Sequence, residues 1–128
     1  MIRQRESAAK VDVVAGDMFT DPLPRGYDVH LFSNVLHDWD VDKVRPLLAA
    51  SFAALTSGGL LLVHDAHLHA DKTGPLPVAK YSARLMSVTE GKCYSLGEME
   101  ALLGEAGFSN VRLTPTVVDR SVISARKP

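Results

Sequence analysis

The sequence predicts an α/β fold in which a mostly parallel sheet ends in an antiparallel hairpin, and three observations carry this prediction. Short runs of β-branched and apolar residues alternate with segments of helical periodicity over most of the 128 residues. The run at 60–63 is continuously apolar, which is typical of a strand buried on both faces of a parallel sheet. Pro115 separates the last two apolar runs, which are therefore expected to form a hairpin.

The elements are expected in the order β, β, α, β, α, α, β, β. Residues 3–10 are polar and are expected to be the tail of a helix. The pair Gly58-Gly59 and the later Gly107 are expected to end helices. Ser95 followed by Glu98 matches a capping box at a helix start. The predicted strands are 11–15, 28–33, 60–63, 111–113 and 117–124, and the predicted helices are 44–55, 78–88 and 96–106.

Composition excludes several classes of protein. Hydrophobic residues make up 46% and charged residues 23% of the chain, as in a soluble globular domain. The formal net charge of −1 gives no electrostatic reason to expect a nucleic-acid or membrane partner. No apolar run approaches the roughly 20 residues that span a bilayer, and the first residues lack a secretory apolar segment. The single cysteine, Cys93, excludes an internal disulfide, and a cytoplasmic location is the default expectation.

Three short segments with reactive side chains each follow a predicted strand, at 16–19, 33–40 and 64–65. Ligands of such sheets bind beyond the carboxyl ends of the strands, so we expect all three segments to face one crevice. In the second segment, His37 is a candidate general base, because an unperturbed histidine has a pKa of ~6.5. A carboxylate beside it could fix its tautomer.

Two segments leave alternatives open. Trp39 could stack on an aromatic ligand, or it could pack in the core while Asp40 or Asp42 caps the next helix. Asp17 could accept hydrogen bonds from a ligand, with Met18 and Phe19 offering apolar surface. Spacing alone favours the other interpretation, in which Asp17 caps the following turn.

The histidines between positions 64 and 69 raise the question of a metal site. If strand alternation continued, Asp65, His67 and His69 would share one face. No C-x-x-C or H-E-x-x-H pattern accompanies them, and the stretch runs into a loop, so no metal is expected. A metal-dependent hydrolase that uses His64, His67 and His69 is the least favoured interpretation.

Four stretches, in this order, resemble the S-adenosylmethionine-dependent O-methyltransferases of the plant caffeate and bacterial polyketide types. They are V-V-A-G-D-M-F at 13–19, S-N-V-L-H-D-W at 33–39, S-G-G-L-L-L-V-H-D at 57–65 and G-K-C-Y-S-L-G-E-M at 91–99. The ending A-G-F at 106–108 also fits, and the likeness runs over nearly the whole chain. The combination of G-D-M-F with L-H-D-W carries most of the specificity.

The resemblance implies transfer of a methyl group from S-adenosylmethionine to a hydroxyl of a small aromatic or polyketide-like acceptor. It places His37 at the position of the general base and Asp65 at or next to the acid that orients this base. Met86 falls in a helix that lines the acceptor pocket in the family. The resemblance assigns five residues to the cofactor, namely Asp17, Met18, Phe19, Ser33 and Trp39.

The sequence also departs from the family. Cys93 lies about where some plant members have a second acidic residue, and Ser33 stands where those enzymes have a lysine. Nothing before Val11 matches the glycine-rich turn and ribose-binding acid of the family's first strands, nor its helical dimerisation domain. Residues 1–128 are therefore expected to be the C-terminal portion of a class I methyltransferase catalytic domain. Its Rossmann-like sheet would be partial, and its cofactor site incomplete.

In the family, the missing strands lie between those predicted here at 11–15 and 28–33. Their absence would leave a bare apolar edge, and such edges pair with other chains. The sequence thus predicts a homo-oligomer or strand exchange. It also leaves open a second function, that of a non-catalytic fragment or partner subunit that binds another chain through this edge.

Overall fold

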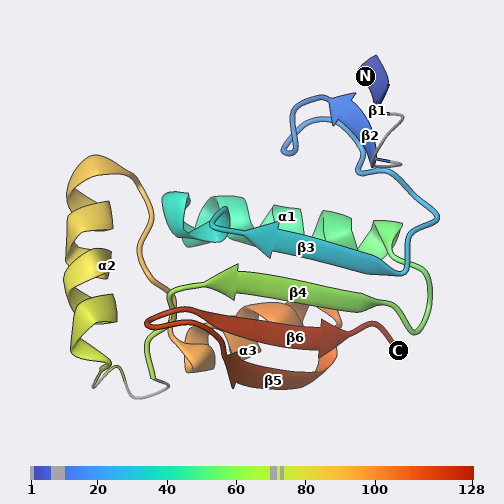
Figure 1. The fold of residues 1–128 in the computed structure, drawn as a ribbon. Helices are drawn as coiled ribbons and strands as arrows, with labels where there is room; N and C mark the ends of the chain where they lie inside the picture. Colours follow the sequence, from blue (N-terminus) through green and yellow to red (C-terminus); the bar gives the residue numbers. More distant parts are fainter. Residues whose placement is uncertain (1, 7–10, 70–71, 73) are drawn as a thin grey trace.

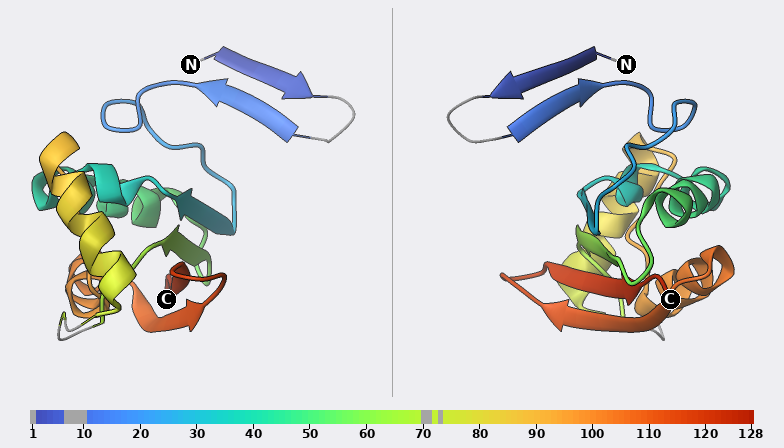
Figure 2. Two further views of the ribbon diagram at one scale, coloured as in Figure 1. Left: turned by 60° about the vertical axis from the view of Figure 1, so that its left-hand side comes forward. Right: turned by 90° about the vertical axis from the view of Figure 1, so that its right-hand side faces the viewer.

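The computed structural model describes residues 2–6, 11–69, 72 and 74–128, which form a small four-stranded sheet, three α-helices and a separate two-stranded hairpin (Figures 1 and 2). The hairpin consists of β1 (Ile2–Glu6) and β2 (Val11–Ala15). The sheet has the order β3-β4-β6-β5. Its strands are β3 (Val29–Ser33), β4 (Leu60–Asp65), β5 (Ser109–Pro115) and β6 (Ser121–Arg126). The helices are α1 (Val41–Ala54), α2 (Leu76–Val88) and α3 (Leu96–Ala106), with a short 3₁₀ helix η1 (Leu36–Asp38) before α1.

The sheet is mixed rather than mostly parallel. β3 runs parallel to β4, whereas β4 pairs with β6, and β6 with β5, in antiparallel fashion. The α/β class and the C-terminal antiparallel hairpin are therefore confirmed. The parallel part is smaller than expected because β2 pairs with β1 and lies outside this sheet.

The N-terminal segment corrects one prediction. Residues 2–6 form strand β1, where the tail of a helix was expected for 3–10, while 7–10 lie outside the described residues. β1 pairs along its whole length with β2, from Ile2 opposite Ala15 to Glu6 opposite Val11. Polar residues adopt a strand here because the neighbouring strand provides partners for their backbone groups.

The helix boundaries follow from capping. α1 begins at Val41, three residues before the predicted start, because the Asp40 carboxylate caps it and accepts from the Val41 N–H at 2.7 Å. The predicted capping box of Ser95 and Glu98 is present at the start of α3. Gly107, with a φ of 108°, ends α3 in the left-handed conformation that glycine adopts readily.

The last two strands are displaced from their predicted positions. Pro115 pairs with Ser121, so residues 116–120 form the turn between β5 and β6. Val117 and Val118 lie in this turn, and Val118 is 97% exposed with a φ of 56°. The prediction of a strand from 117 was wrong because pairing of the flanking residues determined the turn, despite the β-branched side chains within it.

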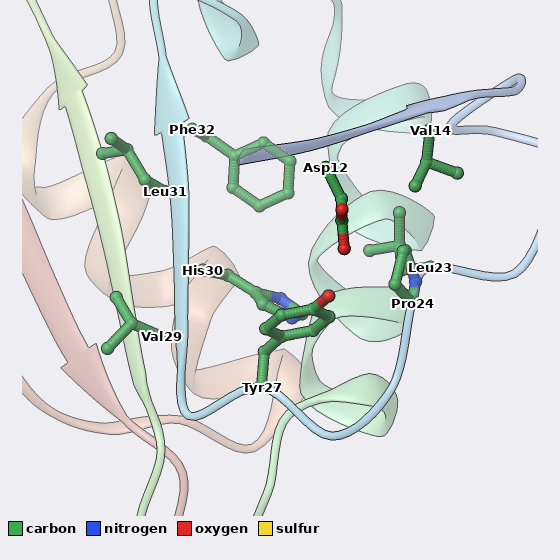
Figure 3. Close-up of a pocket in the computed structure, with 9 residues that line it drawn as sticks. All are labelled: Asp12, Val14, Leu23, Pro24, Tyr27, Val29, His30, Leu31 and Phe32. Carbon is green, nitrogen blue, oxygen red and sulfur yellow. The ribbon is translucent and has the colours of Figure 1, made fainter. Parts of the chain in front are cut away.

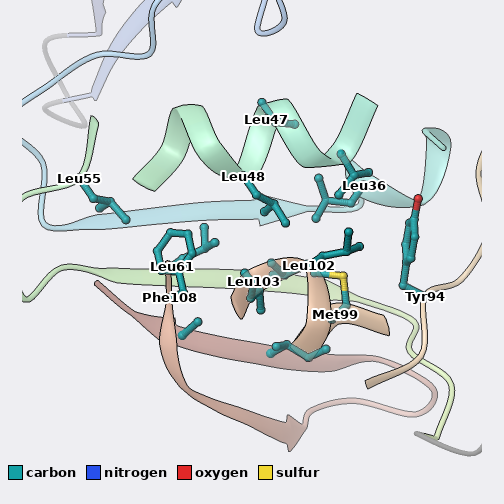
Figure 4. Packing of buried hydrophobic residues seen from close by; sticks show 14 residues of the cluster. Leu36, Leu47, Leu48, Leu55, Leu61, Tyr94, Met99, Leu102, Leu103 and Phe108 are labelled. Atoms are coloured by element: carbon teal, nitrogen blue, oxygen red, sulfur yellow. The ribbon is translucent and has the colours of Figure 1, made fainter. Parts of the chain in front are cut away.

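The core lies between α1 and α3 on one face of the sheet (Figure 4). In β4, Leu61 and Val63 are buried against these helices, whereas Leu60 and Leu62 are only half-buried. Burial of this strand on both faces was therefore a wrong prediction, because the described helices α1 and α3 cover only one face. None of the described helices is long and apolar enough to cross a membrane.

Candidate active site

The parallel pairing of β3 and β4 brings the two principal candidate segments together. Ser33, at the end of β3, lies opposite His64 near the end of β4. Asn34 then adopts a φ of 55° and donates its N–H to the His64 carbonyl at 2.9 Å. Asparagine tolerates this left-handed conformation better than most residues. The chain turns at this point into η1, which carries His37.

His37 and Asp65 form a buried pair at this end of the sheet. The His37 Nδ1 and Asp65 Oδ1 atoms are 2.7 Å apart, and the two residues are 7% and 3% exposed. The same carboxylate oxygen accepts the Ala66 N–H at 2.8 Å. Because a carboxylate oxygen only accepts hydrogen bonds, Nδ1 carries the hydrogen and the Nε2 lone pair is left to take a proton. Nε2 lies 3.4 Å from Oδ1 of Asp38, whose side chain is about half exposed.

Tyr81 of α2 completes the surroundings of the histidine, although sequence reasoning did not single it out. Its ring lies edge-on to His37, with centroids 5.9 Å apart and an interplanar angle of 72°. The Arg120 guanidinium carbon lies 5.1 Å from the centre of the Tyr81 ring. The signal that could have found Tyr81 was its position in the helix predicted at 78–88, which resembles the acceptor-lining helix of the family. That resemblance drew attention only to Met86. That residue is 65% exposed and lines a separate hollow of about 400 Å³ next to Gly91 and Lys92.

Two of the candidate cofactor residues, Phe19 and Trp39, come together where the loop after β2 meets η1. The rings of Phe19 and Trp39 pack edge to face at 4.8 Å, and the Lys43 ammonium lies over both. Met18 packs against the hydrophobic core that lies between the sheet and the helices α1 and α3. The Ser33 hydroxyl is 2.9 Å from Nδ1 of His64, near the start of η1.

Local capping contacts are present at both segments with open alternatives. The Asp17 carboxylate accepts the Phe19 N–H at 2.9 Å and so caps its turn. Asp40 caps α1, and Trp39 packs partly against the core.

The residues present fit one wall of a nucleoside site. Asp17 offers a carboxylate, and Met18, Phe19 and Trp39 offer apolar and aromatic surface near the carboxyl end of β3. The hollow that Asp17 and Met18 line has a volume of about 150 Å³. Sites that enclose a small molecule usually measure at least ~300 Å³, so this hollow encloses only part of a nucleoside cofactor.

His67 and Cys93 are both buried, and burial favours the neutral form of each. Burial lowers the pKa of His67 to about 4, and its Nδ1 lies 2.9 Å from the Ser121 hydroxyl. Burial raises the pKa of the Cys93 thiol to about 12. β4 ends at Asp65, so strand alternation does not continue to His67 and His69. Among the described residues, no group of three or more His, Cys, Asp or Glu side chains could hold a metal ion.

Comparison with known proteins identifies relatives of this chain. A family model described as an O-methyltransferase domain matches residues 2–109. A 3-hydroxy-5-methyl-1-naphthoate 3-O-methyltransferase of Streptomyces sahachiroi is 41% identical over 103 residues, which cover 80% of this chain and 30% of that protein. An acetylserotonin O-methyltransferase of Gallus gallus is 40% identical over 101 residues, which cover 79% of this chain and 29% of that protein.

Solved structures give the same result. The crystal structure of human N-acetylserotonin methyltransferase in complex with SAM superposes with a TM-score of 0.87 at 34% identity. The match covers 93% of this chain and 34% of the human chain. The chain thus spans about a third of the length of these relatives. The matched sequence and fold both show that this chain belongs to the O-methyltransferase domain family.

Proposed function

We propose that residues 1–128 are the C-terminal, base-carrying portion of a class I methyltransferase catalytic domain. In this proposal, the whole domain transfers a methyl group from S-adenosylmethionine to a hydroxyl of a small aromatic or polyketide-like acceptor. The observation that carries the proposal is the buried His37–Asp65 pair, at 2.7 Å, at the carboxyl ends of β3 and β4. The names of relatives support the acceptor class, since they include a hydroxynaphthoate, acetylserotonin and tetracenomycin polyketide methyltransferase.

His37 acts as the general base in this reaction. Its Nε2 accepts the proton of the acceptor hydroxyl, and the resulting imidazolium is stabilised by the Nδ1–H bond to Asp65. The acceptor oxygen is thereby made nucleophilic. The cofactor, when bound, supplies an activated methyl group, so the protein mainly provides alignment and the base. The Tyr81 ring restricts the position of the imidazole from the side of α2.

Five residues are proposed to contact the cofactor, and one is proposed to face the acceptor. Asp17 and Met18 would contact the adenosine part of the cofactor, and Phe19 would also contact the cofactor. Ser33 would lie near the amino-acid end of the cofactor, and Trp39 would flank it. Met86 would line the acceptor pocket once the chain that completes the domain is present. Because the hollow at Asp17 is small, we expect the isolated 128-residue chain to bind S-adenosylhomocysteine weakly in calorimetry. A sub-micromolar dissociation constant would contradict this expectation. A cytoplasmic location remains part of the proposal.

A chimeric enzyme tests the catalytic proposal directly. The matching third of the Streptomyces sahachiroi relative is replaced by this chain, and methyl transfer to the relative's hydroxynaphthoate is measured. We expect the chimera to transfer methyl groups and H37Q to lower kcat by at least ~100-fold. The matched control, H69Q, alters an exposed histidine outside the pair and is expected to keep the rate. A folded chimera that binds S-adenosylhomocysteine but responds equally to H37Q and H69Q would refute the assignment.

The open edge of β3 also favours self-association of the isolated 128-residue chain. A groove of about 660 Å³ lies between this edge and the hairpin, and side chains of both β2 and β3 line it (Figure 3). Leu31, near the middle of β3, is 60% exposed, and Val29 and Tyr27 are 47% and 46% exposed. The chain spans about a third of the length of its relatives, and in the whole domain proposed above further strands would cover this edge. We propose that a second copy pairs with the edge when no completing polypeptide is present.

Sedimentation velocity distinguishes the possibilities at this edge. We expect the wild-type chain to be dimeric, L31K to be monomeric, and the control V118K, which charges an exposed turn, to remain dimeric. A wild-type monomer at high concentration would contradict self-association. Capture of a companion chain by that monomer would instead support the partner-subunit interpretation.

A further inference from the structure

The segment 89–94, between α2 and α3, lies directly against the backbone of the catalytic histidine. Gly91 is buried there, and a Cβ placed on it would be 1.9 Å from the His37 carbonyl oxygen and 2.6 Å from the His37 carbonyl carbon. Real Cβ atoms do not approach other atoms closer than about 3.0 Å. The absence of a side chain at Gly91 is therefore what allows the two backbones to meet.

Hydrogen bonds anchor this segment to α2. The Gly91 N–H donates to the Thr89 hydroxyl at 3.0 Å, and that hydroxyl donates to the Leu85 carbonyl at 2.8 Å. Farther along, the Cys93 N–H donates to the Ser82 hydroxyl at 3.0 Å. Gly91 is thus held between two attachments to the same helix, so it cannot move aside independently.

A second contact holds the chain just beyond the histidine. The Tyr94 hydroxyl donates to the Trp39 carbonyl at 2.6 Å. Tyr94 is buried, and burial raises its pKa, so the hydroxyl stays protonated and remains a donor. Gly91 therefore contacts the peptide that leaves His37, while Tyr94 fixes the carbonyl two residues later.

We propose that Gly91 and Tyr94 are positioning residues that fix the backbone of residues 37–39 and thereby aim the His37 ring at Asp65. This inference rests on the proposed function, in which His37 is the base. A methyl group at Gly91 would need to gain roughly 1 Å of separation from the His37 carbonyl. Because Gly91 is anchored, much of that movement would fall on residues 37–39. A displacement of about 1 Å in a catalytic group can cost ~100-fold in rate.

A matched pair of glycine substitutions tests the proposal in the 128-residue chain itself. G91A introduces the close contact, whereas G104A adds the same methyl group in α3, where nothing lies within 4 Å. The readout is the ¹⁵N-coupled Nδ1–H proton signal of His37, which reports its hydrogen bond to Asp65. We expect this signal to be protected from exchange in the wild type and G104A, and lost or strongly shifted in G91A.

The Y94F variant keeps the test decisive if G91A does not fold. It removes only the hydrogen bond to the Trp39 carbonyl, and we expect a smaller shift of the same His37 signal. A folded G91A with an unchanged His37 signal would overturn the proposal, and so would an unchanged signal in Y94F if G91A is unfolded.

The chimera separates this inference from the proposed function. There, G91A should lower kcat by ~100-fold with little change in KM. If G91A shifts the His37 signal while H37Q leaves methyl transfer intact, the positioning role stands and the proposed base fails. If H37Q abolishes transfer while G91A changes neither the signal nor kcat, the positioning role fails alone.

Discussion

The carboxyl end of β4 and the outer edge of β3 differ in how far the residues of this chain cover them. At the carboxyl end of β4, η1, α2 and the segment 89–94 enclose His37 and Asp65, which are almost fully buried. Along the outer edge of β3, Leu31 is 60% exposed and an open groove separates the strand from the hairpin. The chain therefore assembles the His37–Asp65 pair and its surroundings from its own residues, whereas the hollow at Asp17 is small and open.

The largest expected effect on the free energy of unfolding distinguishes the face of the sheet that the helices cover from the open edge of β3. Leu61 is fully buried between the sheet and the helices, so L61A should lower the free energy of unfolding by about 3 kcal/mol. Leu31 belongs to the open edge, and L31A should change it by less than ~0.5 kcal/mol. Urea denaturation of dilute samples, below any dimerisation, measures both. Equal losses in the two variants would break the comparison, because they would show that the edge of β3 is covered.

A smaller effect should come from acid titration at the closed border. The unfolded chain protonates His67 near pH 6.5, whereas the folded chain does so only near pH 4. Between these values the unfolded state binds more protons, so the free energy of unfolding falls as the pH falls. From about pH 7 to about pH 5, His67 should account for a loss of about 2 kcal/mol.

The H67Q variant isolates this contribution. Glutamine cannot titrate, so the variant should lose about 2 kcal/mol less than the wild type over the same interval. Denaturation curves at several pH values provide the comparison. Parallel pH profiles for the two proteins would show that the ring of His67 is accessible to water.

Capping of α3 should contribute less again. Ser95 accepts the Glu98 N–H at 3.1 Å and directly follows the segment 89–94. S95A should cost about 1 kcal/mol of stability. The control S57A, at an exposed serine beyond α1, should be close to neutral. If S57A were as costly as S95A, the loss could not be assigned to capping.

The smallest effect is expected on the outer surface of α1 and α3. Arg45 and Glu105 form an ion pair at 3.0 Å, but both side chains are more than half exposed. E105Q should therefore change the free energy of unfolding by less than ~0.5 kcal/mol, and less in high salt. Thermal denaturation at two salt concentrations measures it, and a loss above 1 kcal/mol would show that this surface is more enclosed than the structure indicates.

Local sequence patterns predicted the features that are determined by residues close together in the sequence. Residue type and spacing predicted the helix caps at Ser95 and Gly107. The position of His37 after a predicted strand marked it as a candidate site residue. The pairing of His37 with Asp65 was implied by the family resemblance, whereas the sheet argument predicted only that the segments 33–40 and 64–65 face one crevice.

Features that depend on distant contacts were not predictable from such patterns. Strand β1 exists because β2 pairs with it, and Val117 lies in a turn because its flanks pair. Leu60 and Leu62 are only half-buried because the described helices cover one face. Gly91 and Tyr81 lie against His37 although more than forty positions separate each of them from it in the sequence, and no local periodicity predicts such contacts.

The most direct test of the central claim is the tautomer of His37 near neutral pH, measured by long-range ¹H–¹⁵N correlation in the wild type and D65N. We expect Nδ1 to carry the hydrogen that bonds to Asp65 in the wild type, and we expect this preference to be lost in D65N. A wild-type ring protonated on Nε2, or the same tautomer in D65N, would contradict the claim that Asp65 holds His37 ready as the base.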